Sequence, residues 1–295
     1  MSPPDGPLVS IGMPVYNGEA YLRAALDALS AQDWPHFELI VSDNASTDAT
    51  AAVVAEYAAR DGRIRYSRNA ENLGAVANSQ LVVDRARGKY YLWASCHDLW
   101  APSLLRRCVQ IMETDESVVL SFPRAAEIDP DGNRIGPLRG RIDTRGLSRV
   151  ARYYTVTRYI TGYAVYGVFR LAALKQVLPI RRVLGPDAFL LHELSLLGSY
   201  AHVPEELFFL RRMSVARNWK RYFTNLKLTY HWWSFFVLYA DLFRNYLTMI
   251  RDRARSPSEA ILLGIWTVLV LLQRTVLWFA GLLVSIVFPR YYRPW

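Results

Sequence analysis

Short apolar runs alternate with segments of helical apolar spacing through the first 122 residues of this chain. Strands are predicted at Leu8–Met13, Phe37–Val41, Ile64–Ser67, Tyr90–Ala94 and Val118–Phe122, and helices at Ala20–Ser30, Gly74–Arg87 and Pro102–Thr114. Strands that alternate with helices across short connections are typical of a parallel sheet covered on both faces. The alternation therefore predicts an α/β fold.

Polar side chains follow three of these strands at the point where each apolar run stops. The segments are Pro14–Glu19, Ser42–Asp48 and Ser95–Trp100. The carboxyl ends of strands in an open parallel sheet line the crevice where ligands bind. Their carboxylates, amides and imidazole predict a site for a polar, phosphorylated ligand. Ser46 or Thr47 is also predicted to cap the helix that follows, with Asp48 in its first turn.

Composition narrows the class of partner. The chain has 295 residues, 52% of them apolar, which is enough for one large domain or two smaller ones. Its formal net charge of +9 suits nucleic acid, an anionic membrane surface or an anionic substrate. Nucleic acid is the weaker choice, because the sequence has no zinc-ligand spacing and no RNA-binding aromatic signature. Cys96 and Cys108 do not suggest a disulfide framework, and no secretory signal is predicted, so a cytosolic location fits best.

Five short motifs between Leu8 and Val203 share an order and spacing with a known family. They are Pro14-Val15-Tyr16-Asn17, Asp43-Asn44-Ala45-Ser46-Thr47-Asp48, Asn72-Leu73-Gly74 with Asn78, His97-Asp98-Leu99-Trp100 and Gly185-Pro186-Asp187. Together they resemble glycosyltransferase family 2, inverting sugar-nucleotide transferases with the GT-A fold. The resemblance implies a Rossmann-like, mostly parallel sheet in a catalytic domain over residues 1–210. A helical, basic and aromatic-rich region over residues 211–295 would follow it.

The resemblance also implies a set of nucleotide-binding residues. The set is Pro14, Tyr16, Asn17, Glu19, Asp43, Asn44, Asn72 and Asn78. The family usually carries two aspartates where this chain has Asp43-Asn44. An amide both donates and accepts hydrogen bonds whereas a carboxylate only accepts, so uridine, thymidine and guanosine donors all remain open. The alternative is that Asp43 and Asn44 only cap the following helix.

The metal motif departs further from the family pattern. Family members usually carry Asp-x-Asp where this chain reads Ser95-Cys96-His97-Asp98. The resemblance implies that His97 and Asp98 lie near a divalent ion, Mn²⁺ or Mg²⁺, which would neutralise charge on the leaving diphosphate. Magnesium prefers oxygen ligands, whereas manganese accepts imidazole. In the alternative, Asp98 caps a helix beside a hydrogen-bonded His97, and arginines supply the positive charge.

Inversion needs a general base that deprotonates the acceptor hydroxyl opposite the leaving group. The resemblance assigns this role to Asp187, with Glu193 as the reserve; the alternative for Asp187 is a helix N-cap. Gly162, Tyr163 and Gly167 are expected to form the wall on the acceptor side. The Gln-x-x-Arg-Trp signature of processive synthases is absent from the sequence, which favours transfer of one sugar over polymerisation.

The chain changes character after a basic cluster between Arg211 and Arg221. Helices are predicted at Leu226–Ile250 and at Ala260–Phe288, which is apolar apart from Gln273, Arg274 and small hydroxyl residues. One straight helix over 260–288 would be about 43 Å long, more than the roughly 30 Å of a bilayer core. Arginines flank both ends, which argues against a single crossing. The sequence predicts an interfacial or re-entrant pair broken near 273–275, with 226–250 flat on the membrane.

Two hypotheses follow. In the first, the chain is an inverting glycosyltransferase on the cytoplasmic side of the cell membrane. It would transfer a sugar to a lipid-linked or membrane-proximal glycan acceptor, in the synthesis of surface polysaccharide or glycoconjugate. In the second, it is a catalytically weak nucleotide-sugar-binding or scaffold subunit, as the Ser95-Cys96-His97-Asp98 departure suggests. A single membrane span, and an oligomer interface formed by the C-terminal helices, are the alternatives for residues 260–288.

Overall fold

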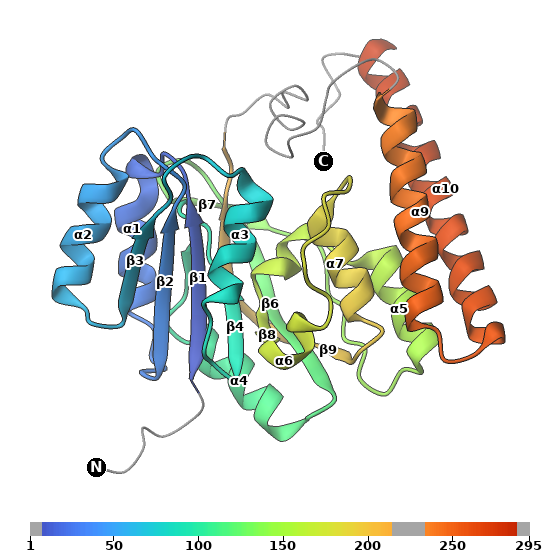
Figure 1. The fold of residues 1–295 in the computed structure, drawn as a ribbon, viewed down its shortest axis with the longest axis horizontal. Coiled ribbons are helices and arrows are strands. Elements are labelled where there is room, and N and C mark those ends of the chain that lie inside the picture. The colour runs from blue at the N-terminus through green and yellow to red at the C-terminus, as the bar shows by residue number, and fades with distance from the viewer. Residues whose placement is uncertain (1–7, 214–233, 288–295) are drawn as a thin grey trace.

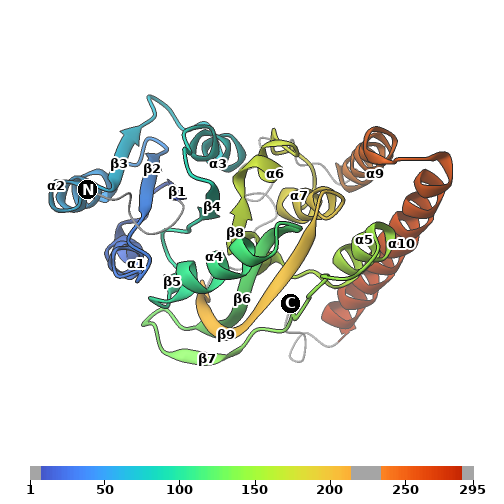
Figure 2. The same ribbon diagram turned by 90° about the horizontal axis from the view of Figure 1, so that it is seen from below.

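The computed structural model describes residues 8–213 and 234–287. Its first part alternates strand and helix: β1 (Val9–Val15), α1 (Glu19–Ser30), β2 (Phe37–Asp43), α2 (Thr50–Arg60), β3 (Ile64–Arg68), α3 (Ala75–Asp84) and β4 (Tyr90–Trp93). These four strands are parallel and lie in the order β3-β2-β1-β4. Figure 2 shows α1 and α3 on opposite faces of β1. The predicted parallel sheet with both faces covered is confirmed.

The second part of the sheet is mixed. It comprises β5 (Leu99–Trp100), α4 (Leu104–Thr114), β6 (Val118–Ile128), β7 (Arg134–Pro137), α5 (Arg149–Tyr159), the 3-10 helix η1 (Gly162–Tyr166), β8 (Val168–Arg170), α6 (Leu171–Lys175), α7 (Pro186–Leu194) and β9 (Ser199–Arg211). Strand β8 lies between β4 and β6 and is antiparallel to both, so β6 runs parallel to the first four strands. Strand β9 is parallel to β6, whereas β5 and β7 are antiparallel additions.

The start of α2 differs from the prediction. The helix begins at Thr50 after Ala49, and no side chain caps it, so Ser46 and Thr47 are not its N-caps. The Ser46 hydroxyl instead accepts a hydrogen bond from the backbone N–H of Asn17 (2.9 Å), and Asp48 Oδ2 accepts one from Glu19 N–H (3.0 Å). These side chains therefore fasten the loop after β2 to the loop after β1.

Two long helices, α9 (Ser234–Arg253) and α10 (Pro257–Val287), follow the sheet and stand beside α5 and α7 (Figure 1). A second hydrophobic cluster joins them to that part of the molecule, and it includes Tyr153, Phe189, Tyr246, Met249 and Leu263. Residues 226–233 of the predicted aromatic helix, and the basic cluster beyond Met213, lie outside the described residues.

The predicted break at 273–275 is wrong, because α10 continues through it as one helix. Within this helix, Arg274 Nη2 donates to the backbone carbonyl of Thr157 on α5 (2.8 Å), so the charge at the predicted break is hydrogen-bonded to the protein. By length and composition, Pro257–Arg274 is the one described stretch apolar enough to cross a membrane.

Candidate active site

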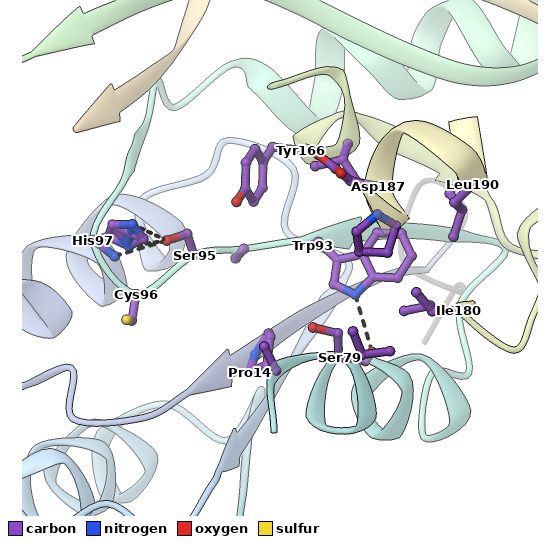
Figure 3. Close-up of a pocket in the computed structure, with 15 residues that line it drawn as sticks. Pro14, Ser79, Trp93, Ser95, Cys96, His97, Tyr166, Ile180, Asp187 and Leu190 are labelled. Carbon is purple, nitrogen blue, oxygen red and sulfur yellow. Dashed lines mark hydrogen bonds between the residues drawn. The ribbon is translucent and has the colours of Figure 1, made fainter. Parts of the chain in front are cut away.

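A cavity of about 310 Å³ opens between the ends of β1 and β4, helix α3 and the start of α7 (Figure 3). It brings together three of the predicted site residues, Pro14, His97 and Asp187. The other lining residues are Ala75, Val76, Ser79, Trp93, Ala94, Ser95, Cys96, Val165, Tyr166, Ile180, Pro186 and Leu190. The cavity thus places Ser95–His97, from the segment that stands where the family usually has Asp-x-Asp, on the same surface as the predicted general base Asp187.

Asp187 is presented by the first turn of α7. The chain enters this helix through Gly185, whose φ of 67° lies in the left-handed region that glycine adopts without strain. Pro186 then occupies the first helical position, where its missing N–H costs nothing. Asp187 itself lies inside the helix and does not cap it, so the N-cap alternative is wrong.

The Asp187 carboxylate is exposed and forms no hydrogen bond or ion pair with another side chain among the described residues. A Cβ atom at Gly162 would lie 3.4 Å from its Oδ2, so the predicted acceptor-wall glycine packs beside this carboxylate. An accessible, unpaired carboxylate at a cavity wall has the geometry of a general base.

Glu193, the reserve base, is placed elsewhere. It lies near the end of α7, only 4% of its side chain is exposed, and it does not line the cavity. Arg253 of α9 binds its Oε1 at 2.8 Å, and Arg181 lies 3.8 Å from its Oε2. A buried carboxylate held by two arginines serves packing between α7 and α9 rather than proton transfer to a ligand in the cavity.

The structure separates the two predicted metal ligands. The His97 side chain lines the cavity and shares a hydrogen bond with the Ser95 hydroxyl. Asp98 is fully buried behind it, where Oδ1 accepts a hydrogen bond from the backbone N–H of Arg211 (2.8 Å). Burial raises the pKa of Asp98, and its Oδ2 has no partner in the described structure. Asp98 therefore supports the segment that presents His97.

Within residues 8–213 and 234–287, no three His, Cys, Asp or Glu side chains are grouped so that they could hold a metal ion. The side chains that line the cavity at this strand end belong to Ser95, Cys96 and His97. The His97 imidazole and the Ser95 hydroxyl suit Mn²⁺ better than Mg²⁺, and only when phosphate oxygens of the substrate complete the coordination.

The remaining predicted nucleotide residues surround the ends of β1 and β2, beside the cavity rather than in it. Asn17 has a positive φ of 51°, and its Oδ1 accepts from the backbone N–H of Thr47 (2.8 Å). Glu19 Oε2 accepts from Ala49 N–H (3.1 Å), and Tyr16 is 48% exposed. Ala45, with a φ of 60°, is a second strained position at the same edge. Strained backbone of this kind costs ~1–3 kcal/mol per residue and is concentrated at functional sites.

Asp43 and Asn44 do not cap α2. The buried Asp43 carboxylate accepts hydrogen bonds from Ser46 N–H (2.8 Å) and from the Tyr66 hydroxyl (3.0 Å). Asn44 donates from Nδ2 to Oδ1 of Asn72 (2.8 Å). These contacts tie together the loops that a nucleotide would cross.

Asn78 is placed differently from the other nucleotide residues. Only 2% of it is exposed, and it is bound to both the hydroxyl (2.7 Å) and the backbone carbonyl (2.9 Å) of Ser42. It therefore holds α3 to β2 and does not face the cavity.

Sequence reasoning missed most residues of the cavity wall, and Trp93, Tyr166 and Arg211 are examples around the site. Trp93 and Tyr166 line the cavity, and burial, with Asp98 and Asp187 nearby, raises the pKa of Tyr166 above its usual value. The buried Arg211 donates from Nε to the His97 carbonyl (2.8 Å) and from Nη1 to the Pro130 carbonyl (2.7 Å). The antiparallel pairing of β9 with β5, the strand that follows His97, brings Arg211 to His97, and the local sequence around Arg211 carried no signal of that pairing.

This sheet and its strand-end site define a GT-A-like glycosyltransferase fold, and solved structures share it. Staphylococcus aureus TarS residues 1–349 in complex with UDP-GlcNAc superimposes with a TM-score of 0.64 at 17% identity, covering 87% of this chain and 70% of that one. The Pyrobaculum calidifontis mannosyltransferase PcManGT, in complex with GDP-Man and Mn²⁺, gives a TM-score of 0.57 at 16% identity, covering 97% and 83%.

Residues 10–172 match the model of glycosyl transferase family 2, and the chain belongs to this family of inverting glycosyltransferases. It is 31% identical over 126 residues to TuaG of Bacillus subtilis, a putative teichuronic acid biosynthesis glycosyltransferase, covering 43% of this chain and 50% of TuaG. It is 34% identical over 131 residues to an uncharacterised glycosyltransferase of Methanocaldococcus jannaschii, covering 44% and 45%. The chain thus spans about half the length of the curated relatives it matches.

Proposed function

We propose that this protein transfers one sugar from a nucleotide-diphosphate sugar to a glycan acceptor, with inversion and with Asp187 as the general base. The observation that carries the proposal is the exposed, unpaired Asp187 carboxylate in one cavity with the strand end at Ser95–His97. Solved structures of the same fold contain UDP-GlcNAc or GDP-Man, which supports a nucleotide-sugar donor.

In the proposed reaction the nucleotide lies over the ends of β1 and β2, and the diphosphate reaches the strand end at His97. Asp187 takes the proton of the acceptor hydroxyl as that oxygen forms a bond to the anomeric carbon and the bond to the diphosphate breaks. The Cys96 thiol also lines the cavity, but burial raises its pKa to about 11, so it is protonated at neutral pH and does not compete as a nucleophile.

Manganese is the proposed cofactor, with His97 as its protein ligand and Asp98 holding the segment in place. When bound, such an ion would act as a Lewis acid that stabilises the departing diphosphate. The Mn²⁺ bound in PcManGT and the imidazole of His97 support this choice over Mg²⁺.

The acceptor is proposed to be lipid-linked or membrane-proximal, on the cytoplasmic side of the cell membrane. Helix α10 supports this, because it exposes large apolar side chains such as Ile261 (62% exposed) and Leu272 (58% exposed). The relative TuaG, which is named for teichuronic acid biosynthesis, also supports a glycan acceptor. Release of the protein from membranes by carbonate or high salt, without detergent, would contradict insertion of α10.

The test is Asp187→Asn with the full chain and Mn²⁺. We expect donor hydrolysis or transfer to fall by roughly 10²–10⁴-fold, because general-base catalysis contributes about that much, while nucleotide binding is kept. Asp252→Asn, on the exposed end of α9, is the matched control and should leave turnover unchanged. Unchanged turnover in Asp187→Asn would remove the base assignment.

The alternative, a nucleotide-sugar-binding scaffold subunit, is favoured by one observation. Asp98 is buried and does not reach the cavity, which leaves the strand end with fewer carboxylates than its family pattern. Nucleotide-sugar binding by the wild-type chain without any Mn²⁺-dependent turnover would support this alternative.

A further inference from the structure

The two ends of the cavity differ in chemistry. Figure 3 shows Ser95 and His97 at one end, and Trp93, Ile180 and Leu190 at the other, with Asp187 between them. The only polar atom of the Trp93 side chain, the indole Nε1, donates to the backbone carbonyl of Ser79 (3.4 Å). The Trp93 side chain therefore offers the cavity an apolar ring surface. The far end is therefore an apolar wall, and Ser79 and Asp187 are among the polar residues that line the same cavity.

The position of the transferred sugar follows from the proposed function, on which this inference rests. The anomeric carbon must lie between the diphosphate at His97 and the base Asp187, so the sugar ring occupies this cavity. The volume of about 310 Å³ is at the small end for ligand pockets, which suits a sugar ring rather than a whole nucleotide sugar. Among the predicted nucleotide residues only Pro14 lines it, so the nucleotide extends outside.

We propose that the donor sugar is a 6-deoxyhexose whose C6 methyl group contacts the wall of Trp93, Ile180 and Leu190. Carbon 6 of a hexopyranose projects from the ring, so a substituent there reaches farther than the ring hydroxyls. A hydroxyl on that carbon would lose water without gaining a partner from the wall, whereas a methyl group gains apolar contact. The ring hydroxyls can pair with Ser79, Asp187 and the strand end at Ser95.

The experiment compares matched donors that differ by one hydroxyl. UDP-glucose, dTDP-glucose and GDP-mannose are each measured beside the 6-deoxy form of the same sugar, with the full chain and Mn²⁺. For the best-bound base, we expect kcat/KM of donor hydrolysis to favour the 6-deoxy form by roughly 10- to 100-fold, the usual limit for rejection of an added hydroxyl by an apolar pocket. Equal use of both forms, or preference for the hydroxylated form, overturns the inference and leaves the proposed function intact.

A lack of binding and turnover with all six donors overturns this inference, whereas the proposed function is tested separately by Asp187→Asn. Ile180→Thr then tests the wall directly, because the new hydroxyl offers C6–OH a partner, and we expect the preference to shrink by about 10-fold. Ile135→Thr on β7, where the isoleucine is 44% exposed, is the matched control and should keep the wild-type ratio. An unchanged ratio in a folded Ile180→Thr protein overturns the assignment of this wall.

Discussion

Individual side chains at the strand ends hold the loops together. Asp43 binds three groups of the protein, and Asn44 joins the β2 loop to Asn72 and to the backbone N–H of Leu73. The motif identified these residues correctly as neighbours, because strand ends of a parallel sheet meet at one edge. The exposed fraction distinguishes the predicted nucleotide-binding residues. Tyr16 is exposed to solvent, whereas Asn78 is buried and hydrogen-bonded to Ser42 of β2.

A residue-scale prediction concerns Gly167, at the end of η1. A Cβ atom there would lie 2.7 Å from both the Phe122 Cβ and the Ser121 carbonyl oxygen, neither of which can move without disturbing β6. We expect Gly167→Ala to lower the free energy of unfolding by about 1–3 kcal/mol through overpacking. Gly62→Ala, where nothing lies within 4 Å of the added carbon, is the control and should be neutral or slightly stabilising. Urea denaturation measures both; equal midpoints would contradict the packing argument.

At the scale of elements, the helix that carries the proposed base is braced by α9. The Phe189 and Tyr246 rings are 4.8 Å apart, the Tyr246 hydroxyl bonds to His192 Nδ1 (2.5 Å), and Arg253 holds Glu193. All three contacts lie C-terminal to Asp187 on α7. The C-terminal helices therefore stabilise the orientation of α7, whatever else they bind.

This brace predicts a pH dependence of stability. Burial, with the Arg274 charge nearby, lowers the pKa of His192 well below its usual value, so His192 is neutral in the folded protein. The unfolded chain binds a proton there below about pH 6.5, so stability is present above that pH and is lost as the pH falls below it. The slope should approach about 1.4 kcal/mol per pH unit from this group. His192→Gln should flatten that part of the profile. The measurement is the shift of the urea midpoint between pH 7 and pH 5. An equal shift in the wild type and in His192→Gln would contradict this role of His192.

The elements themselves were predictable to different degrees. Strands β1, β2 and β4 were visible in the sequence because each is a buried run rich in apolar residues, such as Leu39–Val41 before Ser42. Strand β8 was not predicted, because its three residues are too few to show the alternation of apolar and polar side chains that marks a strand. Strand β9 carries Glu205 and Glu206 in its middle, and each pairs with an arginine of a distant segment. The burial of Asp98 depends on β9, so the sequence could place it in the motif but not behind the cavity.

On the scale of the whole molecule, α10 has two different sides. One side packs on α5, through the Tyr153–Thr267 hydrogen bond (2.7 Å) and the Tyr154–Trp266 ring contact (4.3 Å). The other side leaves Ile261, Leu262, Ile265, Val268, Leu269 and Leu272 exposed. Figure 2 shows α10 at the outer boundary of the molecule, beside α5. A helix that packs on protein along one side cannot be surrounded by lipid there, so this geometry favours contact with the membrane interface over a free span.

We therefore expect the full chain to float with anionic phospholipid vesicles, since Arg244 and Arg251 on α9 are also exposed for contact with lipid headgroups. Ile265→Glu combined with Leu269→Glu should weaken vesicle binding by about 10-fold or more, because burial of each side chain contributes roughly 1.5–3 kcal/mol when complete. The control is Ile135→Glu on β7, which adds one of these negative charges at an exposed isoleucine away from α10. A detergent-free wild-type dimer that the double variant dissociates, with no vesicle binding by either protein, would instead identify this side of α10 as a contact between two copies of the chain.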